Sequence, residues 1–453
     1  MERLELTFCP RWRDGSVSDM RVSGMLSSLP KTESPILTAF QSTVGIPFAV
    51  YDGLALQDEN GTVPFSVSPV SSKQDFVALA GIFSKREVKG SLRWEYTVYP
   101  RILPKGYTSS PYFDFRIEQG GFNSAGITFL LLPEEGTWET RIHWDLSELP
   151  DGARGIWSLG IKDAARETDA ETLRFSYYMA GLINAEERGD FGIYWFGDVP
   201  FDIEAASKRI RDLFSYMCEF FCDTEPIYRV FLRCDPFEKS GGGTALARSF
   251  MTGYSAATPP DIERWFNVIA HEMVHNWPSM SDEPAGKGTW YTEGIAEYYS
   301  ALLPLRAGLA DIEETARQIT SKAARYYESA LRLMSNDELA EIYWSDRRAQ
   351  VVPYGRGLVY IANVEAQLKR ANRGSIDEIS VRYQKDHPME PENWVGFLPE
   401  RLGEPAVVEF EEMKAGKLIV PDEEAFGGLF TATEISVEID GNMETGFEWR
   451  AKR

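Results

Sequence analysis

Two histidines with a glutamate between them form the part of this sequence that is best suited to chemistry. His271 and His275 stand four residues apart, and Glu272 directly follows the first of them. Four residues is about one turn of an α-helix, so both imidazoles project from the same face and can share one tetrahedral metal ion, with the glutamate beside them. This His-Glu-x-x-His pattern is typical of zinc sites in which the glutamate acts as a general base. We therefore predict that His271 and His275 bind zinc.

A catalytic zinc ion usually takes a third protein ligand and leaves its fourth position open for water. The candidate for the third ligand is Glu293, which lies in the next helical pattern of the chain. We predict one catalytic Zn²⁺ bound by His271, His275 and Glu293, with Glu272 activating a zinc-bound water. The alternative is that these side chains are ordinary polar members of two amphipathic helices.

Other residues that commonly bind metals lack such neighbours in the sequence. Cys218 and Cys222 are one helical turn apart, but no second pair of ligands flanks them, so we interpret them as small core residues. The remaining two histidines, His143 and His387, also stand alone and are interpreted as exposed or hydrogen-bonded side chains. We assign no metal to these four residues.

The zinc ligands require two neighbouring helices, and the surrounding periodicity predicts them. A helix carrying the first two ligands begins near Thr258-Pro259-Pro260 and ends before Pro278, because proline is favoured in the first helical turn and stops a helix that reaches it. A second helix delivers Glu293. The chain has a largely helical pattern from Pro260 to about Tyr383.

The first part of the chain has a different period. Up to about Leu182 the sequence mostly alternates between apolar and polar residues, as in Leu92 to Tyr99, and turn pairs such as Asn60-Gly61 separate these runs. This pattern predicts an amino-terminal antiparallel β-sandwich. An amphipathic helix then runs from Ile203 to about Cys222, and a strand covers Tyr228 to Cys234.

A chain of 453 residues is too long for one ordinary core, so we expect several domains. The predicted fold class is α+β and multidomain. We place the β-sandwich at residues 1–185, the mostly helical domain with the metal motif at residues 186–388, and a small carboxy-terminal appendage at residues 389–453. The appendage mixes a short helix with β-like pieces such as Thr433 to Ile439.

The composition argues against several other classes of protein. The formal net charge of −22 repels phosphate backbones and anionic lipids, so we expect no nucleic acid partner. No apolar run is long enough to span a membrane, and residues 1–10 lack the apolar centre of a signal peptide. Only 4 cysteines are present, which is consistent with a reducing compartment, and we predict a cytoplasmic location without membrane association. The oligomeric state is left open.

Beyond the zinc motif, the sequence resembles the gluzincin metallopeptidases, and among them the glycyl aminopeptidase family more than the aminopeptidase N group. Members of the family follow the first metal helix with a Glu-Gly-x-x-x-Tyr pattern, matched here from Glu293 to Tyr298. They later carry a Tyr-x-Lys-Gly-like motif, which corresponds to Tyr354-Gly355-Arg356-Gly357. The resemblance implies a thermolysin-like catalytic domain, a peptide substrate and an oxyanion-stabilising role for Tyr354, whose alternative is a packed tyrosine.

The resemblance also extends upstream, where Gly241-Gly242-Gly243 is similar to a glycine-rich substrate strand of the family. It implies that backbone groups of Gly242, Gly243 and Thr244 bind the substrate, and the alternative is a simple loop. Related enzymes place a glutamate shortly after these glycines to hold the free amino group of the substrate, but this chain has Ala245 there. We predict a zinc-dependent peptide-bond hydrolase, with an aminopeptidase as first choice. The alternatives are an endopeptidase that uses the same site, and a catalytically silent zinc-binding interaction protein.

Overall fold

The computed structural model describes this 453-residue chain as two compact units. The first consists of Met1–Ser207 and Ile227–Trp265, and the second of Lys208–Pro226 and Phe266–Arg453. The structure describes all residues except 1, 29–34, 44–45, 48–50, 73–76, 103–112, 237–241, 256, 259, 278–282, 284–285, 384–390 and 453.

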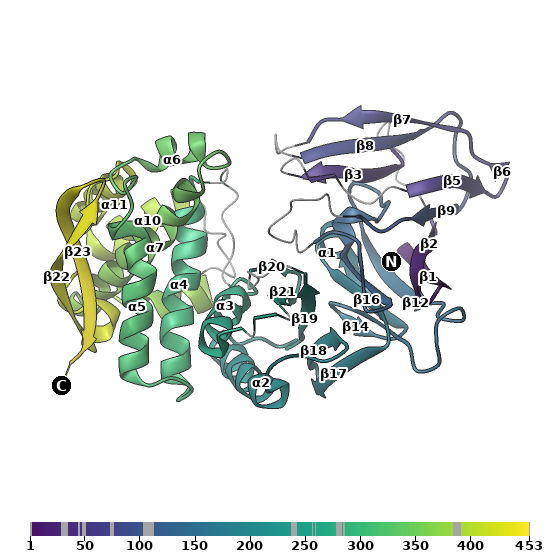
Figure 1. Ribbon diagram of the computed structural model, residues 1–453. Helices are drawn as coiled ribbons and strands as arrows, with labels where there is room; N and C mark the ends of the chain where they lie inside the picture. The colour runs from purple at the N-terminus through teal and green to yellow at the C-terminus, as the bar shows by residue number, and fades with distance from the viewer. Residues whose placement is uncertain are drawn as a thin grey trace. The chain divides into compact units, whose positions relative to one another are not determined.

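The first unit is built mainly from strands (Figure 1). Its strands are β1 (Glu2–Arg13), β2 (Ser16–Leu26), β3 (Leu37–Thr43), β4 (Ile46–Pro47), β5 (Tyr51–Asp58), β6 (Gly61–Thr62), β7 (Phe65–Val70), β8 (Val77–Ser84), β9 (Leu92–Val98), β10 (Arg116–Glu118), β11 (Gly121–Ala125), β12 (Thr137–Trp144), β13 (Arg154–Trp157), β14 (Gly160–Ile161), β15 (Ala164–Asp169), β16 (Tyr177–Gly181), β17 (Ile183–Arg188), β18 (Phe191–Phe196), β19 (Tyr228–Asp235), β20 (Gly243–Leu246) and β21 (Ser249–Ser255). Short helices are η1 (Gly126–Thr128) and α1 (Ala170–Arg174).

Most strands of this unit pair with antiparallel neighbours, as their alternating sequence predicts. In the sheet with the order β15-β12-β1-β2-β9-β5-β6, strand β9 alternates buried and exposed side chains, which confirms the predicted strand near residues 92–99. Among the described strands of residues 1–185, for which an antiparallel sandwich was predicted, one pairing departs from the prediction, because β1 runs parallel to β12. The burial pattern of a strand determines which face is covered but not the direction of its neighbour, so the parallel pairing could not be predicted from periodicity.

Aromatic side chains from two sheets share one hydrophobic core in the first unit. Phe8 of β1 lies 5.1 Å from Trp144 and 5.4 Å from Tyr178 between ring centroids, and Tyr178 belongs to the sheet β10-β11-β16-β13-β14. Tilted and edge-on ring pairs of this kind pack densely and contribute beyond their buried area. The core explains why β1, β9 and β16 carry apolar side chains toward the same interior.

The last sheet of the first unit mixes both strand directions and has the order β17-β18-β19-β21-β20. Strands β18 and β19 are parallel, and the chain between them forms helix α2 (Ile203–Phe220), as a parallel crossover requires. The predicted helix and the predicted strand at Tyr228 to Cys234 are therefore confirmed.

The second unit is mostly helical, so the chain as a whole is α+β. Its further elements are α3 (Ile262–Val274), α4 (Thr289–Arg306), α5 (Ile312–Tyr327), α6 (Asn336–Ile342), α7 (Arg347–Arg370), α8 (Ile376–Glu378), η2 (Ile379–Tyr383), α10 (Pro391–Leu402), α11 (Glu404–Lys414), η3 (Ala425–Gly428), β22 (Phe430–Ile439) and β23 (Asn442–Ala451). The strands β22 and β23 form a hairpin that packs on α5. None of the described helices is both long and apolar enough to cross a membrane.

Side-chain caps set the starts of the central helices. Asp311 accepts a hydrogen bond from the backbone of α5, and Asp346 does the same for α7, so both satisfy amides that the first turn leaves free. Ser335 and Glu338 form a reciprocal capping box at α6. These caps explain why the long helical pattern breaks into separate helices at these points.

Two glycines let helices α4 and α7 touch through their backbones. A Cβ atom added to Gly294 would lie 2.6 Å from Cα of Gly357, and one added to Gly357 would lie 1.8 Å from the carbonyl oxygen of Trp290. Gly355 makes a similar approach to α5, because its added Cβ would lie 2.9 Å from the carbonyl oxygen of Lys322. Only glycine permits such close contact, so these positions hold α7 against both neighbouring helices (Figure 1).

Candidate active site

Helix α3 places the first two predicted zinc ligands together. His271 lies in its last turn, and His275 follows directly after its last residue, Val274. The apolar face of this helix is buried, with Ile269 and Met273 fully covered. The ring centroids of the two histidines are 5.0 Å apart, so the four-residue spacing brings the imidazoles to one place, as predicted.

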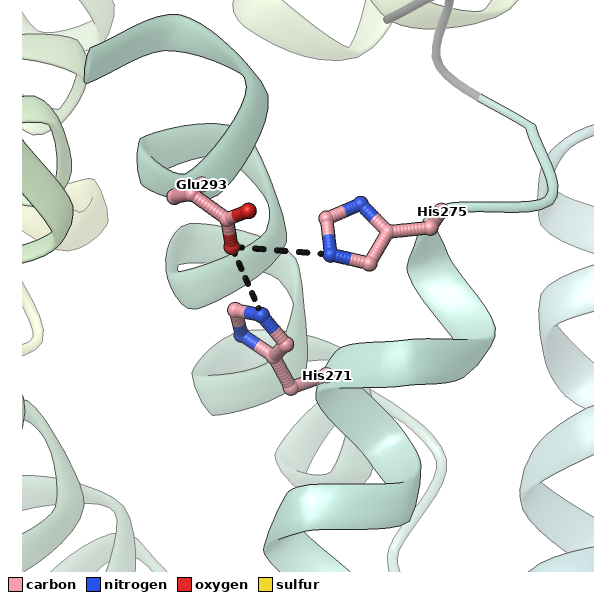
Figure 2. A group of neighbouring side chains, drawn as sticks. All are labelled: His271, His275 and Glu293. Atoms are coloured by element: carbon pink, nitrogen blue, oxygen red, sulfur yellow. Dashed lines mark hydrogen bonds and ion pairs between the residues drawn. The ribbon is translucent and has the colours of Figure 1, made fainter. Parts of the chain in front are cut away.

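Helix α4 brings Glu293 to the same two rings (Figure 2). Its Oε2 atom lies 3.0 Å from Nε2 of His271 and 3.5 Å from Nε2 of His275. One ligand atom from each of the three side chains falls within 4.8 Å of the others. His271 and Glu293 belong to two separate helices and His275 directly follows the first of them, and all three side chains point toward a common centre.

The chemistry of this group fits a zinc ion. Two imidazole nitrogens and one carboxylate oxygen are the donor types that catalytic zinc sites use, and they leave a position open. The three side chains are only 10%, 11% and 16% exposed, so water shields their charges poorly. A cation held between them would neutralise the carboxylate and use the lone pairs that face one another.

The pKa values within the group show how strongly its members interact. Burial alone would lower the pKa of His271, but the carboxylates of Glu297 and Glu293 outweigh it and raise that pKa to about 10. Burial would raise the pKa of Glu293, but hydrogen bonds from the two histidines lower it to about 2. Glu293 is therefore ionised at neutral pH, as a carboxylate that binds a metal must be.

A second carboxylate lies on the far side of the His271 ring. Oε1 of Glu297, one turn after Glu293 on α4, is 3.6 Å from Nδ1 of His271. Glu297 is 1% exposed, and its oxygens face Nζ of Lys322 and Nη1 of Arg325, the latter at 2.7 Å. The Lys322 and His271 partners hold the pKa of Glu297 well below its usual range against the effect of burial.

Glu272 lies in the same turn of α3 as His271, and its surroundings suit proton transfer. Burial raises the pKa of its carboxyl group above the usual range, and the neighbouring carboxylate of Glu293 adds to the rise, while the histidines oppose it. A raised pKa makes the ionised carboxylate a stronger base, which favours uptake of a proton from water.

Tyr354 of α7 reaches the metal-ligand group, as its place in the sequence motif suggested. Its ring stacks on the His271 imidazole with centroids 5.8 Å apart and an angle of 9° between the planes. Burial, together with the nearby Glu293 carboxylate, raises the pKa of the phenol well above its usual value. The hydroxyl group therefore keeps its proton and remains a hydrogen-bond donor.

The region that contains the three ligand residues also carries the sequence match that decides the resemblance. Residues 264–351 match the family model of M61 glycyl aminopeptidase. The match covers His271, Glu272, His275 and Glu293 and ends before Tyr354. The predicted resemblance to the glycyl aminopeptidase family is thus confirmed for this part of the chain. No curated protein matches the sequence.

Solved structures of similar fold extend the comparison to nearly the whole chain. An aminopeptidase N family protein from Idiomarina loihiensis is 13% identical with a TM-score of 0.71, over 95% of this chain and 79% of that one. An M1 zinc metallopeptidase from Deinococcus radiodurans is 16% identical with a TM-score of 0.56, over 94% and 95% of the two chains. Yeast LTA4 hydrolase is 13% identical with a TM-score of 0.57, over 94% and 69%. At these identities the likeness concerns the fold.

The M61 match, the shared fold and the His-His-Glu group together support a zinc metallopeptidase, in agreement with the prediction. The donor types of the His-His-Glu group fit zinc, the predicted cofactor. The M61 match reaches neither the glycine-rich segment nor Tyr354.

The residues predicted to bind substrate lie in the first unit and outside the M61 match. Gly243 and Thr244 belong to β20, and Gly242 directly precedes it, while Gly241 lies outside the described residues. Gly242 accepts hydrogen bonds at its carbonyl oxygen from Gly253 N at 3.1 Å and from the Thr252 hydroxyl at 3.0 Å. Among the described strands, β20 pairs with β21 alone and forms the edge of its sheet.

The remaining sequence candidates stay outside the metal-ligand group. Cys218 is buried in α2 and Cys222 is exposed, and His143 is exposed and paired with Asp163. His387 lies outside the described residues.

Lys322 and Arg325, the cations beside Glu297, were not predicted from the sequence. A signal was present, because Lys322 falls on the buried face of amphipathic α5 with Ile319, Ala323 and Tyr326. A lysine in an apolar helical stripe needs a buried partner.

Proposed function

We propose that this chain is a zinc-dependent peptide-bond hydrolase, with an aminopeptidase as the first choice. The convergence of His271, His275 and Glu293 within 4.8 Å, inside the region that matches the M61 family model, carries the proposal. The structure of a mutant of the similar M1 zinc metallopeptidase from Deinococcus radiodurans was determined with a bound Tyr-Ser-Ala substrate. We accordingly propose a peptide as the substrate class here.

His271, His275 and Glu293 would hold the zinc ion, which when bound supplies a Lewis acid that acidifies water and polarises the scissile carbonyl group. Glu272 takes one proton from the attacking water at its carboxylate. It then delivers this proton to the nitrogen of the leaving amine as the C–N bond breaks. The raised pKa of Glu272 supports both roles, since the carboxyl group can carry the proton between the two steps.

Tyr354 donates a hydrogen bond from its hydroxyl group to the carbonyl oxygen as negative charge develops there. Its stacking on the His271 ring places the phenol beside the ligand group, and its raised pKa keeps the proton in place. Replacement by phenylalanine removes only this donor. We expect Tyr354→Phe to lower kcat about a hundredfold while zinc binding stays unchanged.

We assign substrate backbone binding to Gly242, Gly243 and Thr244. Among the described strands β20 forms the edge of its sheet, and an edge strand can pair with an extended peptide in the way that strands add to a sheet. Glycine at the first two positions lets the substrate approach the backbone closely.

The endopeptidase alternative rests on one observation in the same strand. Ala245 of β20 carries a methyl group and cannot pair with a charged amino terminus, although related enzymes place a glutamate there. Without this carboxylate, the strand offers no charged partner that would favour peptides with a free amino terminus. We also retain the predicted amino-terminal β-sandwich, thermolysin-like catalytic domain and cytoplasmic location as part of the proposal.

The decisive experiment is hydrolysis of a peptide panel, with each sequence supplied with a free and with an acetylated amino terminus. Zinc-loaded wild type and Glu272→Gln are compared, with zinc content measured for both. Release of single amino-terminal residues from free peptides, together with an inactive variant, supports the aminopeptidase. Internal cuts in acetylated peptides identify an endopeptidase. If the zinc-loaded wild type cuts none of the peptides, the hydrolase proposal is wrong and the silent zinc-binding protein is favoured.

A further inference from the structure

A chain of charged side chains connects the first zinc ligand to helix α5. His271 faces the other two ligands with Nε2, and its Nδ1 atom is buried without a hydrogen-bond partner among the described residues. The carboxylate oxygen Oε1 of Glu297 lies 3.6 Å from this nitrogen. A histidine that binds a metal through Nε2 carries its hydrogen on Nδ1. A carboxylate that accepts a hydrogen bond from Nδ1 can fix the orientation of the imidazole ring.

Glu297 needs compensation because it is buried inside the second unit. An ionised carboxylate that is 1% exposed is very costly unless positive charges and hydrogen bonds surround it. Lys322 donates to Oε2 of Glu297, and Arg325 donates to Oε1 over 2.7 Å. Both cations stand on α5, three residues apart and thus on the same helix face.

The two cations differ in their surroundings. The Lys322 side chain is 7% exposed and also donates to the hydroxyl group of Ser300 at 3.1 Å, so its position is closely determined. The Arg325 side chain is 46% exposed, and solvent screens its charge. Lys322 is therefore the main partner of Glu297.

We propose that Lys322 is a positioning residue for zinc, which acts through Glu297 to hold the His271 ring in the orientation and tautomer that bind the metal, with Arg325 in a lesser role. The inference rests on the proposed zinc site. It makes α5 a determinant of metal affinity, although α5 contributes no zinc ligand. Partners that hydrogen-bond to ligating histidines typically change metal affinity about tenfold to a hundredfold when they are removed.

The test is the zinc dissociation constant of the purified full chain, measured by competition with a fluorescent chelator, together with the rate at which the chelator removes zinc. We expect Lys322→Met and Glu297→Gln to weaken zinc binding at least about tenfold. Lys322→Arg restores a cation and should recover part of the affinity. Arg325→Gln should have a smaller effect than Lys322→Met.

Lys369→Met is the matched control. Lys369 also pairs with a buried glutamate, Glu365, at 3.7 Å, but this pair lies on α7 and neither residue contacts the His271 ring in the described structure. This variant loses the same charge and should bind zinc like the wild type.

The double variant Glu297→Gln/Lys322→Met keeps the test possible if the single variant Lys322→Met does not fold. It removes both buried charges together and leaves neither unpaired, so it should fold even if Lys322→Met does not. A folded double variant with weakened zinc binding supports the inference. A folded single or double variant that binds zinc within about twofold of the wild type overturns it, provided that His271→Ala abolishes binding. If His271→Ala also binds zinc normally, the proposed zinc site itself is wrong.

Discussion

Each unit of this molecule contains a buried polar network, and the two networks differ in how their charges are compensated. In the first unit, Arg233 is fully buried and donates to Asp114 at 2.6 Å, to Asn123 and to the Tyr177 hydroxyl at 2.8 Å. In the second unit, two histidines and Glu293 converge over 3.0 and 3.5 Å, and Nδ1 of His271 has no hydrogen-bond partner among the described residues.

The difference separates a structural network from a candidate active site. The Arg233 guanidinium pairs with a carboxylate and with carbonyl acceptors of the protein, so the protein itself compensates its charge. The His271 group directs lone pairs at a common centre and is complete only with a cation. Buried charge alone therefore does not identify the candidate site. The convergence of several metal-ligand atoms on one point does.

The largest expected effect is on zinc content. His271→Ala removes one of three ligands, so the purified variant should lose zinc almost completely, as measured by elemental analysis after dialysis against a weak chelator. His143→Ala is the control, because His143 is exposed and pairs only with Asp163 among the described groups near it. Equal zinc content in the wild type and in His271→Ala would show that His271 is not a zinc ligand. The network of the second unit would then no longer differ from the Arg233 network by binding a metal.

Next in size is the effect of breaking the Arg233 network. Arg233→Met leaves the buried Asp114 with less compensation and should lower the free energy of unfolding by about 3 to 5 kcal/mol, as measured by urea denaturation. Arg141→Met is a suitable control in the same unit, because Arg141 pairs with Glu139 at the surface and should matter little. A loss below about 1 kcal/mol for Arg233→Met would show that the network contributes little to stability.

A third prediction concerns pH and Glu118, whose carboxyl group accepts hydrogen bonds from Cys234 N at 2.7 Å and from Asn123 at 3.1 Å. Burial raises its pKa to about 7. The folded state then holds a proton that the unfolded state has released, so the stability of the wild type falls as pH rises from about 4.5 to 7.

Glu118→Gln cannot titrate, so its stability relative to the wild type should increase over this range by an amount on the order of 3 kcal/mol. Urea denaturation of both proteins at pH 5 and pH 8 measures the change, and any loss of hydrogen bonds in the variant adds a constant that is independent of pH. A difference that stays the same at both pH values would contradict the raised pKa.

The smallest expected effect concerns the contact between helices α4 and α7, which carry Glu293 and Tyr354. Gly357→Ala places a methyl group against the carbonyl oxygen of Trp290 and should cost about 1 to 3 kcal/mol of stability. Gly396→Ala is the control, since Gly396 also lies in a helix but has no atom within 4 Å of an added Cβ among the described residues. It should be neutral or stabilising by up to about 1 kcal/mol. Similar melting temperatures for both variants would mean that α4 and α7 adjust easily.

Much of this architecture could be predicted because it depends on local periodicity. The helical period alone places His271 and His275 on one face, and alternation identifies strands such as β9. The later motif pointed to Tyr354, which the structure brings to the His271 ring.

The features that escaped prediction depend on contacts between distant parts of the chain. Lys322 and Glu297 are 25 residues apart, and Arg233 and Asp114 are 119 residues apart, so no local pattern joins them. The parallel pairing of β1 with β12 is likewise set by tertiary packing. The sequence could show that Lys322 lies in an apolar stripe but could not name its partner.

The crossing of α4 and α7 at Gly294 and Gly357 has a practical meaning for protein engineering. The residues on either side, Glu293 and Tyr354, are held by a contact between main chains, which offers no side chain to exchange. A library aimed at new substrates should therefore leave both glycines constant and vary positions elsewhere. Substitution of either glycine would change the distance between Glu293 and Tyr354, which is a larger disturbance than a change in substrate selectivity requires.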